Sequence, residues 1–352
     1  MNSKAANPKS ISLALQGGGS HGAFTWGVLD ALLEDGRLAI DGISGASAGA
    51  MNAVALGQGY AAVHGSKRDP REAAREALAQ FWGAVGQLGA ASAVLQSVVN
   101  VWMGGWGKTA ASIAQNSISP YQANPMDINP LRRLVEQQFD FERIGKLAAP
   151  KIFISATHVK TGKAEIFSGK RLNAASLMAS ACLPNLFQAV EIEGEHYWDG
   201  GFSSNPALHP LIYRCSACDV VLVQINPVER NEVPSSTADI ADRINELTFN
   251  ASLLSQMRAI DFVNRMLLSG RLDDKRYRPV LLHRIDGGEA LEAYPASSKA
   301  SANGSMIEKL HDLGRLCAKQ WLAKRFADVG ERSTVNIAKD YLDDMRMGSA
   351  GD

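Results

Sequence analysis

Residues 11–56 alternate short apolar runs with glycine-rich turns, and this alternation constrains the fold more than any other part of the chain. Residues 11–15 predict a buried strand, because an apolar run is followed directly by turn glycines. Residues 23–34 carry apolar side chains at helical spacing, and Gly36 stands where a helix C-cap belongs. Residues 40–44 and 51–56 predict a second strand and a second helix. A strand, a helix and a strand in this order form a βαβ unit, in which the two strands run parallel.

The rest of the chain continues the alternation. Further strands are predicted at residues 151–157, 164–167, 219–225 and 279–285, and further helices at 71–85, 174–181, 249–268 and 306–326. The pattern predicts an α/β protein with three α/β/α layers around a mostly parallel central sheet. No internal repeat or linker splits the 352 residues. We expect a flexible N-terminus at 1–10, a catalytic core at 11–228, and a mainly helical C-terminal extension at 229–352 that packs on the core.

Charge and hydropathy narrow the classes of partner. Thirty-six basic residues balance thirty-six acidic ones, which argues against nucleic acid, because phosphate binding needs a basic surface. The first ten residues lack the apolar segment of a signal peptide, and the longest charge-free run, residues 77–107, is too polar for a membrane span. We therefore expect a cytoplasmic protein. Peripheral contact with the inner membrane face stays open, because apolar side chains alone can drive it, and so does self-association.

The four cysteines do not form a disulfide framework. Cys215 and Cys218 are spaced as C-x-x-C, but a zinc site needs a second pair or histidines at matching spacing, and the sequence has neither. We interpret the pair as small residues beside the strand at 219–225. The sequence predicts no metal and no other cofactor.

Gly45-Ala46-Ser47-Ala48-Gly49 matches the pattern G-x-S-x-G between a predicted strand and a predicted helix. A sharp strand-to-helix turn of this kind exposes the serine oxygen, and only small residues fit on either side of it. The helix N-terminus also favours developing negative charge. Ser47 is therefore a candidate nucleophile, although the five residues alone also fit a plain glycine-rich turn.

The glycine-rich turn Gly17–Gly22 can direct several backbone N–H groups toward one point. Such a turn at the start of a helix can bind an anion, either a nucleotide phosphate or the oxyanion of a tetrahedral intermediate. The dinucleotide-binding pattern also expects an acidic residue at the end of the next strand. That strand ends instead in the turn at Ser47, which favours an oxyanion hole.

Asp199-Gly200-Gly201 is a third candidate element. Glycines beside an aspartate allow the aspartate to approach another segment of backbone closely. Taken alone, the tripeptide is an ordinary turn.

Together and in this order, the three motifs resemble those of the patatin-like phospholipase family. Residues 179–187 are similar to the family pattern A-S-x-A-x-P-x-x-F, and Asn205-Pro206 follows the D-G-G motif as in that family. The resemblance covers about residues 11–227. One position departs from the pattern, because His21 stands where the family often has arginine or lysine. This departure puts a preference for anionic head groups in doubt.

The resemblance implies a lipid acyl hydrolase of phospholipase A or lysophospholipase type that acts on lipid or lysolipid without a metal. It implies a Ser–Asp dyad in which Ser47 is the nucleophile, forming an acyl-enzyme, and Asp199 is the general base. The backbone amides of Gly18, Gly19 and Ser20 would form the oxyanion hole. The glycines that would support the three motifs are Gly17, Gly22, Gly45, Gly49, Gly200 and Gly201.

Several alternatives remain. A Ser-His-Asp esterase, thioesterase or acyltransferase would use a histidine downstream of Asp199, namely His209, His283 or His311. A module of another class would bind lipid with an inert site. Residues 88–106 fit either a lid over the site or a buried helix. The helix predicted at 249–268 fits packing on the sheet better than membrane docking.

Overall fold

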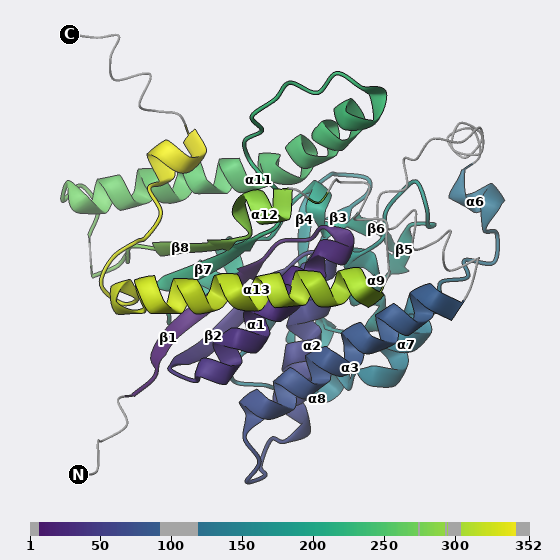
Figure 1. Ribbon diagram of the computed structural model, residues 1–352, viewed down its shortest axis with the longest axis horizontal. Coiled ribbons are helices and arrows are strands. Elements are labelled where there is room, and N and C mark those ends of the chain that lie inside the picture. The colour runs from purple at the N-terminus through teal and green to yellow at the C-terminus, as the bar shows by residue number, and fades with distance from the viewer. Residues whose placement is uncertain (1–6, 92–118, 274, 293, 295–303, 343–352) are drawn as a thin grey trace.

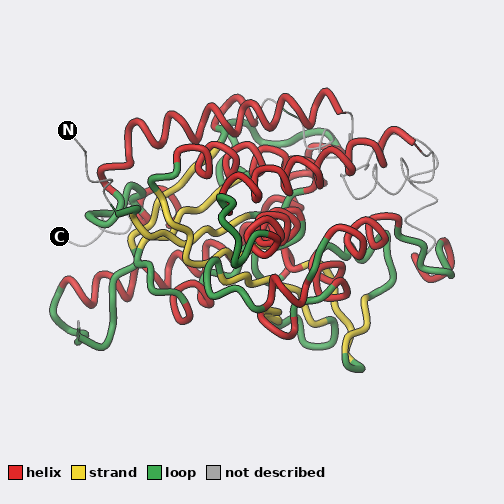
Figure 2. Tube along the Cα trace, turned by 90° about the horizontal axis from the view of Figure 1, so that it is seen from below, coloured by secondary structure: helices red, strands yellow, loops and turns green. Residues whose placement is uncertain are grey.

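The computed structural model describes residues 7–91, 119–273, 275–292, 294 and 304–342. In this part of the chain a central sheet of eight strands lies between helices on both faces (Figures 1 and 2). The predicted three-layer α/β/α fold is confirmed.

The sheet is mostly parallel and has the strand order β5-β6-β3-β2-β1-β7-β8, with β4 paired to β3. The opening βαβ unit is present, because β1 and β2 pair in parallel. The antiparallel strands gather at one side, where β4 and β6 both pair with β3 and β5 pairs with β6. The strands are β1 (Lys9–Leu15), β2 (Leu38–Gly45), β3 (Lys151–His158), β4 (Ala164–Ser168), β5 (Val190–Ile192), β6 (Glu195–Asp199), β7 (Asp219–Gln224) and β8 (Leu281–Asp286).

Alternation along the central strands divides the core into two layers. On β1, Leu13 and Leu15 pack with the helices of one face, whereas Ala14 packs with those of the other. This is the period of two expected for a strand buried on both faces. The first face is covered by α1 (Gly22–Asp35), α2 (Ala48–Ala62), α3 (Pro70–Ala91), α7 (Pro130–Gln138), α8 (Phe141–Gly145), α9 (Ala174–Ser180), α12 (Gly288–Glu292) and α13 (Gly304–Arg325). The second is covered by α10 (His209–Arg214) and α11 (Thr237–Leu268), and α6 (Pro120–Ala123) lies at the periphery (Figure 1).

The C-terminal residues are built into this architecture. After α11, the chain returns to the sheet as β8, which pairs in parallel with β7. The helix α13 then packs directly on α1 at two glycines. A Cβ added at Gly27 would lie 1.9 Å from the carbonyl oxygen of His311, and one at Gly314 would lie 2.1 Å from that of Phe24. The two helix backbones therefore touch.

Some bounds differ from those predicted. Strand β1 begins at Lys9, and α11 begins at Thr237, well before the predicted start at residue 249. The Ser236 hydroxyl caps this early start by accepting the Asp239 N–H over 3.1 Å. Of the segment 88–106, only residues 88–91, in the last turn of α3, lie within the described residues. Cys215 and Cys218 are free thiols beside β7.

Candidate active site

Ser47 lies between the end of β2 and the start of α2, in a backbone conformation with φ 52° and ψ −122°. A positive φ is uncommon for a residue with a side chain and stores strain. The flanking glycines are needed for close packing. A Cβ at Gly45 would lie 2.5 Å from the backbone of Gly49, and a Cβ at Gly49 would lie 2.2 Å from the carbonyl oxygen of Leu15. The predicted sharp turn is therefore present, with the candidate nucleophile at its apex.

Asp199 is the last residue of β6 and is fully buried. Strand β3 lies between β6 and β2, and its residue Ala156 pairs with Asp199. The glycines that follow permit this approach, because a Cβ at Gly200 would lie 2.1 Å from the Ser155 carbonyl oxygen. The Gly201 N–H donates to Asp199 Oδ1 over 2.7 Å. The fold thus brings the D-G-G motif to the end of β6, two strands away from β2, after which Ser47 lies.

The Asp199 carboxyl is an unusually strong base for an aspartate. Burial raises its pKa to about 7, against the lowering effects of the Gly201 amide and the Ser47 hydroxyl. Its Oδ2 atom is buried and makes no hydrogen bond among the described residues. This leaves one carboxylate oxygen available to take a proton near neutral pH.

The end of α9 and the residues directly after it contact both candidate catalytic residues. The Ser47 N–H donates to Ser180 Oγ over 3.0 Å, and the Asp199 N–H donates to the Cys182 carbonyl oxygen over 2.7 Å. Burial and the nearby charge of Asp199 raise the pKa of the Cys182 thiol to about 12. Through these two hydrogen bonds, the A-S-x-A-x-P segment holds the backbones of Ser47 and Asp199 at a fixed separation. The family pattern predicts this segment, but nothing in the sequence distinguishes Ser180.

The glycine-rich loop packs directly against Ser47. A Cβ at Gly17 would lie 2.7 Å from Ser47 Cβ, so a side chain there would occupy the space of the serine. Gly19 has φ 59°, which glycine adopts without strain. The N–H groups of Gly18 and Gly19 make no hydrogen bond to any other described residue. They are therefore available to a ligand beside Ser47.

Four polar side chains hold this loop in place. Gly17 N–H donates to Asn205 Oδ1 over 2.6 Å, and Asn226 Nδ2 donates to the Gly17 carbonyl oxygen over 2.7 Å. Gln16 accepts the Asn226 N–H over 2.9 Å and donates to Asn250 Oδ1 over 3.2 Å. The sequence pointed to Asn205 alone, because the other three belong to no recognised motif.

Replacing Asn205 with alanine is expected to lower kcat about 10- to 100-fold, because the Gly17 N–H loses its acceptor and the loop amides lose their position. Steady-state kinetics on a soluble ester would measure the change. Asn264→Ala is the matched control, since Asn264 bonds Val280 N and O in the same way at the far end of α11. Full kcat in Asn205→Ala would show that Asn205 does not position the loop.

Comparison with known proteins identifies the family of this chain. A family model for patatin-like phospholipases matches residues 13–212, more than half of the chain. The chain belongs to the patatin-like phospholipase family. A solved structure, VipD from Legionella pneumophila, is similar with a TM-score of 0.43 and 14% identity, over 99% of this chain and 76% of that one. No curated protein sequence matched significantly.

The family match contains Ser47, Asp199 and the glycine-rich loop, whereas Asn226 and Asn250 lie beyond its end. This patatin-like chain therefore holds its loop partly with residues from the region that follows the matched domain.

The structure brings neither His283 nor His311 to Ser47. His283 lies within β8, where it bonds Asp219 Oδ1 over 2.9 Å. β8 is the third strand from β2, a separation of about 14 Å at the usual strand spacing. His311 lies on α13 with its ring centroid 3.9 Å from that of Trp26.

His209 lies near the opposite ends of the strands from Ser47. It lines a cavity together with Lys151, the first residue of β3. Lys151 begins β3, whereas Ser47 follows the end of β2. Because the two strands run parallel, Lys151 and Ser47 lie at opposite ends of the sheet. His209 and His283 are thus far from the candidate nucleophile, whereas His311 packs against Trp26 on α1.

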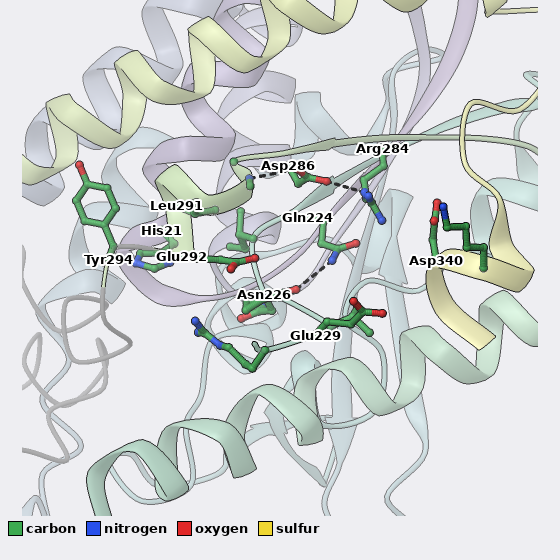
Figure 3. Close-up of a pocket in the computed structure, with 17 residues that line it drawn as sticks. His21, Gln224, Asn226, Glu229, Arg284, Asp286, Leu291, Glu292, Tyr294 and Asp340 are labelled. Carbon is green, nitrogen blue, oxygen red and sulfur yellow. Dashed lines mark hydrogen bonds and ion pairs between the residues drawn. The ribbon is translucent and has the colours of Figure 1, made fainter. Parts of the chain in front are cut away.

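A cavity of about 330 Å³ lies behind the glycine-rich loop, at the ends of β7 and β8 (Figure 3). Neither Ser47 nor Asp199 lines it. His21 forms part of its wall, is 2% exposed, and packs edge-on to Tyr294 with ring centroids 6.4 Å apart. The histidine at the position where the family often has a cation is therefore enclosed, and it does not present a charge on the surface.

The arginines of that cavity are already paired. Arg284 Nε lies 2.6 Å from Asp286 Oδ2, and Arg230 forms an ion pair with the buried Glu246. Within the described part of the chain, no group of three or more His, Cys, Asp and Glu side chains could hold a metal ion. In the same part, none of the helices has the length and apolar character needed to cross a membrane.

Proposed function

We propose that this protein hydrolyses fatty-acyl esters of lipids, as a phospholipase A or lysophospholipase, with Ser47 as nucleophile and Asp199 as general base. Family membership supports the lipid substrate class. The observation that carries the mechanism is the buried Asp199 carboxyl beside Ser47, with a pKa of about 7 and one oxygen without a hydrogen bond. Serine needs such a base, because its hydroxyl is weakly nucleophilic at neutral pH.

The reaction follows from these positions. Asp199 takes the hydroxyl proton as Ser47 Oγ attacks the ester carbonyl carbon, and the loop amides stabilise the oxyanion. Collapse of the intermediate breaks the ester bond, and the departing alcohol or lysolipid takes the proton from Asp199. Asp199 then takes a proton from water, the hydroxide attacks the acyl-enzyme, and the fatty acid leaves as Ser47 regains its proton.

The amides of Gly18 and Gly19 are the main donors in this proposal, with Ser20 as a third. Ser47 itself does not contribute, because its N–H is already bonded to Ser180. The supporting glycines allow the close backbone contacts around Ser47 and Asp199, which a Cβ atom would block. All oxyanion donors therefore come from one loop, which makes activity sensitive to the position of that loop.

The direct test is fatty-acid release from mixed phospholipid vesicles and hydrolysis of a short-chain p-nitrophenyl ester, both in EDTA. The wild-type protein is expected to hydrolyse both without added metal. Should neither substrate react, a fluorophosphonate probe for serine hydrolases would be applied. Failure of the probe to label Ser47 would then refute the proposed activity and support an inert lipid-binding module.

Single replacements of His209, His283 and His311 by glutamine are each expected to keep kcat/KM for the soluble ester within about threefold of wild type, since general-base loss has a far larger effect. The physical reason is that each of these side chains has another partner in the fold. His209 packs against Tyr213, His283 bonds Thr334 and Asp219, and His311 bonds Asp312. Thermal unfolding of each variant provides the control, because His283 is fully buried and its loss affects stability. A drop of two orders of magnitude in one folded variant would restore a histidine triad.

A further inference from the structure

The first half of α11 carries an exposed apolar face, defined here as Ile240, Ile244 and Leu247. Their side chains are 43%, 58% and 52% exposed. The spacings of four and three residues place them on one side of the helix. In Figure 1 the darker green, N-terminal part of α11 extends beyond the strands at the top of the view. A row of large apolar side chains in water is typical of a surface that binds a partner.

The turn of α11 that follows Leu247 contacts the candidate active site. Phe249 packs against the D-G-G motif, since a Cβ at Gly201 would lie 2.0 Å from its ring. Its ring centroid also lies 5.4 Å from that of Phe202, which is 38% exposed. Asn250 accepts from Gln16, which holds the glycine-rich loop. Phe249 and Asn250 therefore connect this part of α11 to the motif that contains Asp199 and to the glycine-rich loop.

Charge indicates which kind of surface the face would meet. Between residues 231 and 248 the sequence has Arg243 as its one cation, against the carboxylates of Glu232, Asp239, Asp242 and Glu246. The Arg243 guanidinium is already paired, because it forms an ion pair with the buried Glu246 and donates to the Val228 carbonyl oxygen over 2.9 Å. An anionic surface would be repelled here, whereas a zwitterionic one would not.

We propose that Ile240, Ile244 and Leu247 form the docking surface through which the enzyme binds a zwitterionic lipid surface and presents its active site to the lipid. This proposal rests on the proposed function, because an enzyme that cleaves lipid esters meets its substrate at an interface. Apolar side chains on one helix face enter the headgroup region while the polar side stays on the protein. The contacts of Phe249 and Asn250 then hold the catalytic loops next to the bound surface.

The test compares Ile244→Asp with Phe262→Asp. Phe262 is 54% exposed and lies on the same side of α11, about 27 Å farther along the helix at the usual rise per residue. Ile244→Asp is expected to lower co-sedimentation with phosphatidylcholine vesicles, and fatty-acid release from them, at least tenfold. Hydrolysis of a soluble p-nitrophenyl ester should stay within twofold, and Phe262→Asp should behave as wild type in every assay. Leu247→Gln, a milder change, should show the same pattern more weakly.

Several results would overturn the proposal. Unchanged vesicle binding in Ile244→Asp would do so, as would an equal loss in Phe262→Asp. Binding that rises when phosphatidylserine is added would contradict the charge assignment. If analytical ultracentrifugation shows a wild-type dimer that Ile244→Asp dissociates, the face binds a second copy of the chain instead of lipid. Vesicle co-sedimentation needs no turnover, so it still tests docking if wild type hydrolyses neither substrate and the proposed function fails.

Discussion

Ser47→Ala is expected to lower the rate of fatty-acyl ester hydrolysis at least about 1,000-fold, because no other described hydroxyl occupies the apex of the turn at the end of β2. The variant removes the atom that forms the acyl-enzyme and leaves the glycine-rich loop unchanged. Initial rates on a p-nitrophenyl ester and on phospholipid vesicles would measure the loss. Labelling by a fluorophosphonate probe should disappear together with activity.

Ser44→Ala is the matched control for this variant. Ser44 is a fully buried serine on β2, three residues before Ser47, and its hydroxyl has no hydrogen-bond partner among the described residues. Removing that hydroxyl should leave both the rate and the fold unchanged. If Ser47→Ala keeps more than a few per cent of the wild-type rate, the nucleophile lies elsewhere and the proposed mechanism fails.

Asp199→Asn is expected to lower hydrolysis by a similar factor of at least about 1,000, because the amide cannot take the proton of Ser47. In the wild type, kcat/KM should rise with pH and level off above about 7, where the carboxyl is ionised. Below that value it should fall about tenfold for each pH unit. A profile that is flat from pH 5 to pH 8, or activity that survives in Asp199→Asn, would exclude Asp199 as the base.

The same variant should be more stable than wild type in alkaline solution. The carboxyl has a pKa of about 7 in the folded protein and an ordinary value of 3.8, so between these values the folded state binds the proton more strongly. Unfolding free energy therefore falls as pH rises from about 4 to 7, and the loss is complete above 7. The rise in pKa from 3.8 to about 7 corresponds to a loss of roughly 4 kcal/mol in unfolding free energy. Asparagine has no such charge to bury.

Urea unfolding of both proteins at pH 9 and at pH 4 would measure this difference. Asp199→Asn should be the more stable by a few kcal/mol at pH 9, and the two proteins should be nearly equal at pH 4, where both side chains are neutral. The low-pH comparison is an internal control for packing changes. Equal stability at pH 9 would mean that the carboxylate is not destabilised by burial.

The opening motifs could be predicted because each depends on local sequence. A glycine flanking a sharp turn is required by its immediate neighbours, so Gly45 and Gly49 identify the turn at Ser47 without further information. The resemblance to patatin-like proteins then added the proposed role of Asp199, which an isolated D-G-G turn does not reveal. The pKa of that residue follows from tertiary burial and could not be read from the chain.

The loop-holding residues could not be predicted for a similar reason. Asn226 and Asn250 contact Gln16 and Gly17 across more than 200 positions of sequence, and an asparagine in a helix or after a strand has no distinctive spacing. The early turns of α11 were missed because their apolar residues, Ile240 and Ile244, do not face the core. Hydrophobic periodicity identifies helices best when the apolar side packs on the protein.

The direct backbone contact between α1 and α13 has a consequence for how the chain folds as it is made. The opening βαβ unit and the turn at Ser47 can form early, because their contacts are local. The outer side of α1, however, is covered only when Gly314 arrives against Phe24, almost 300 residues later. During synthesis the nascent chain therefore exposes an apolar face of α1 until α13 leaves the ribosome, and this is the interval in which chaperones that bind apolar surface protect it most.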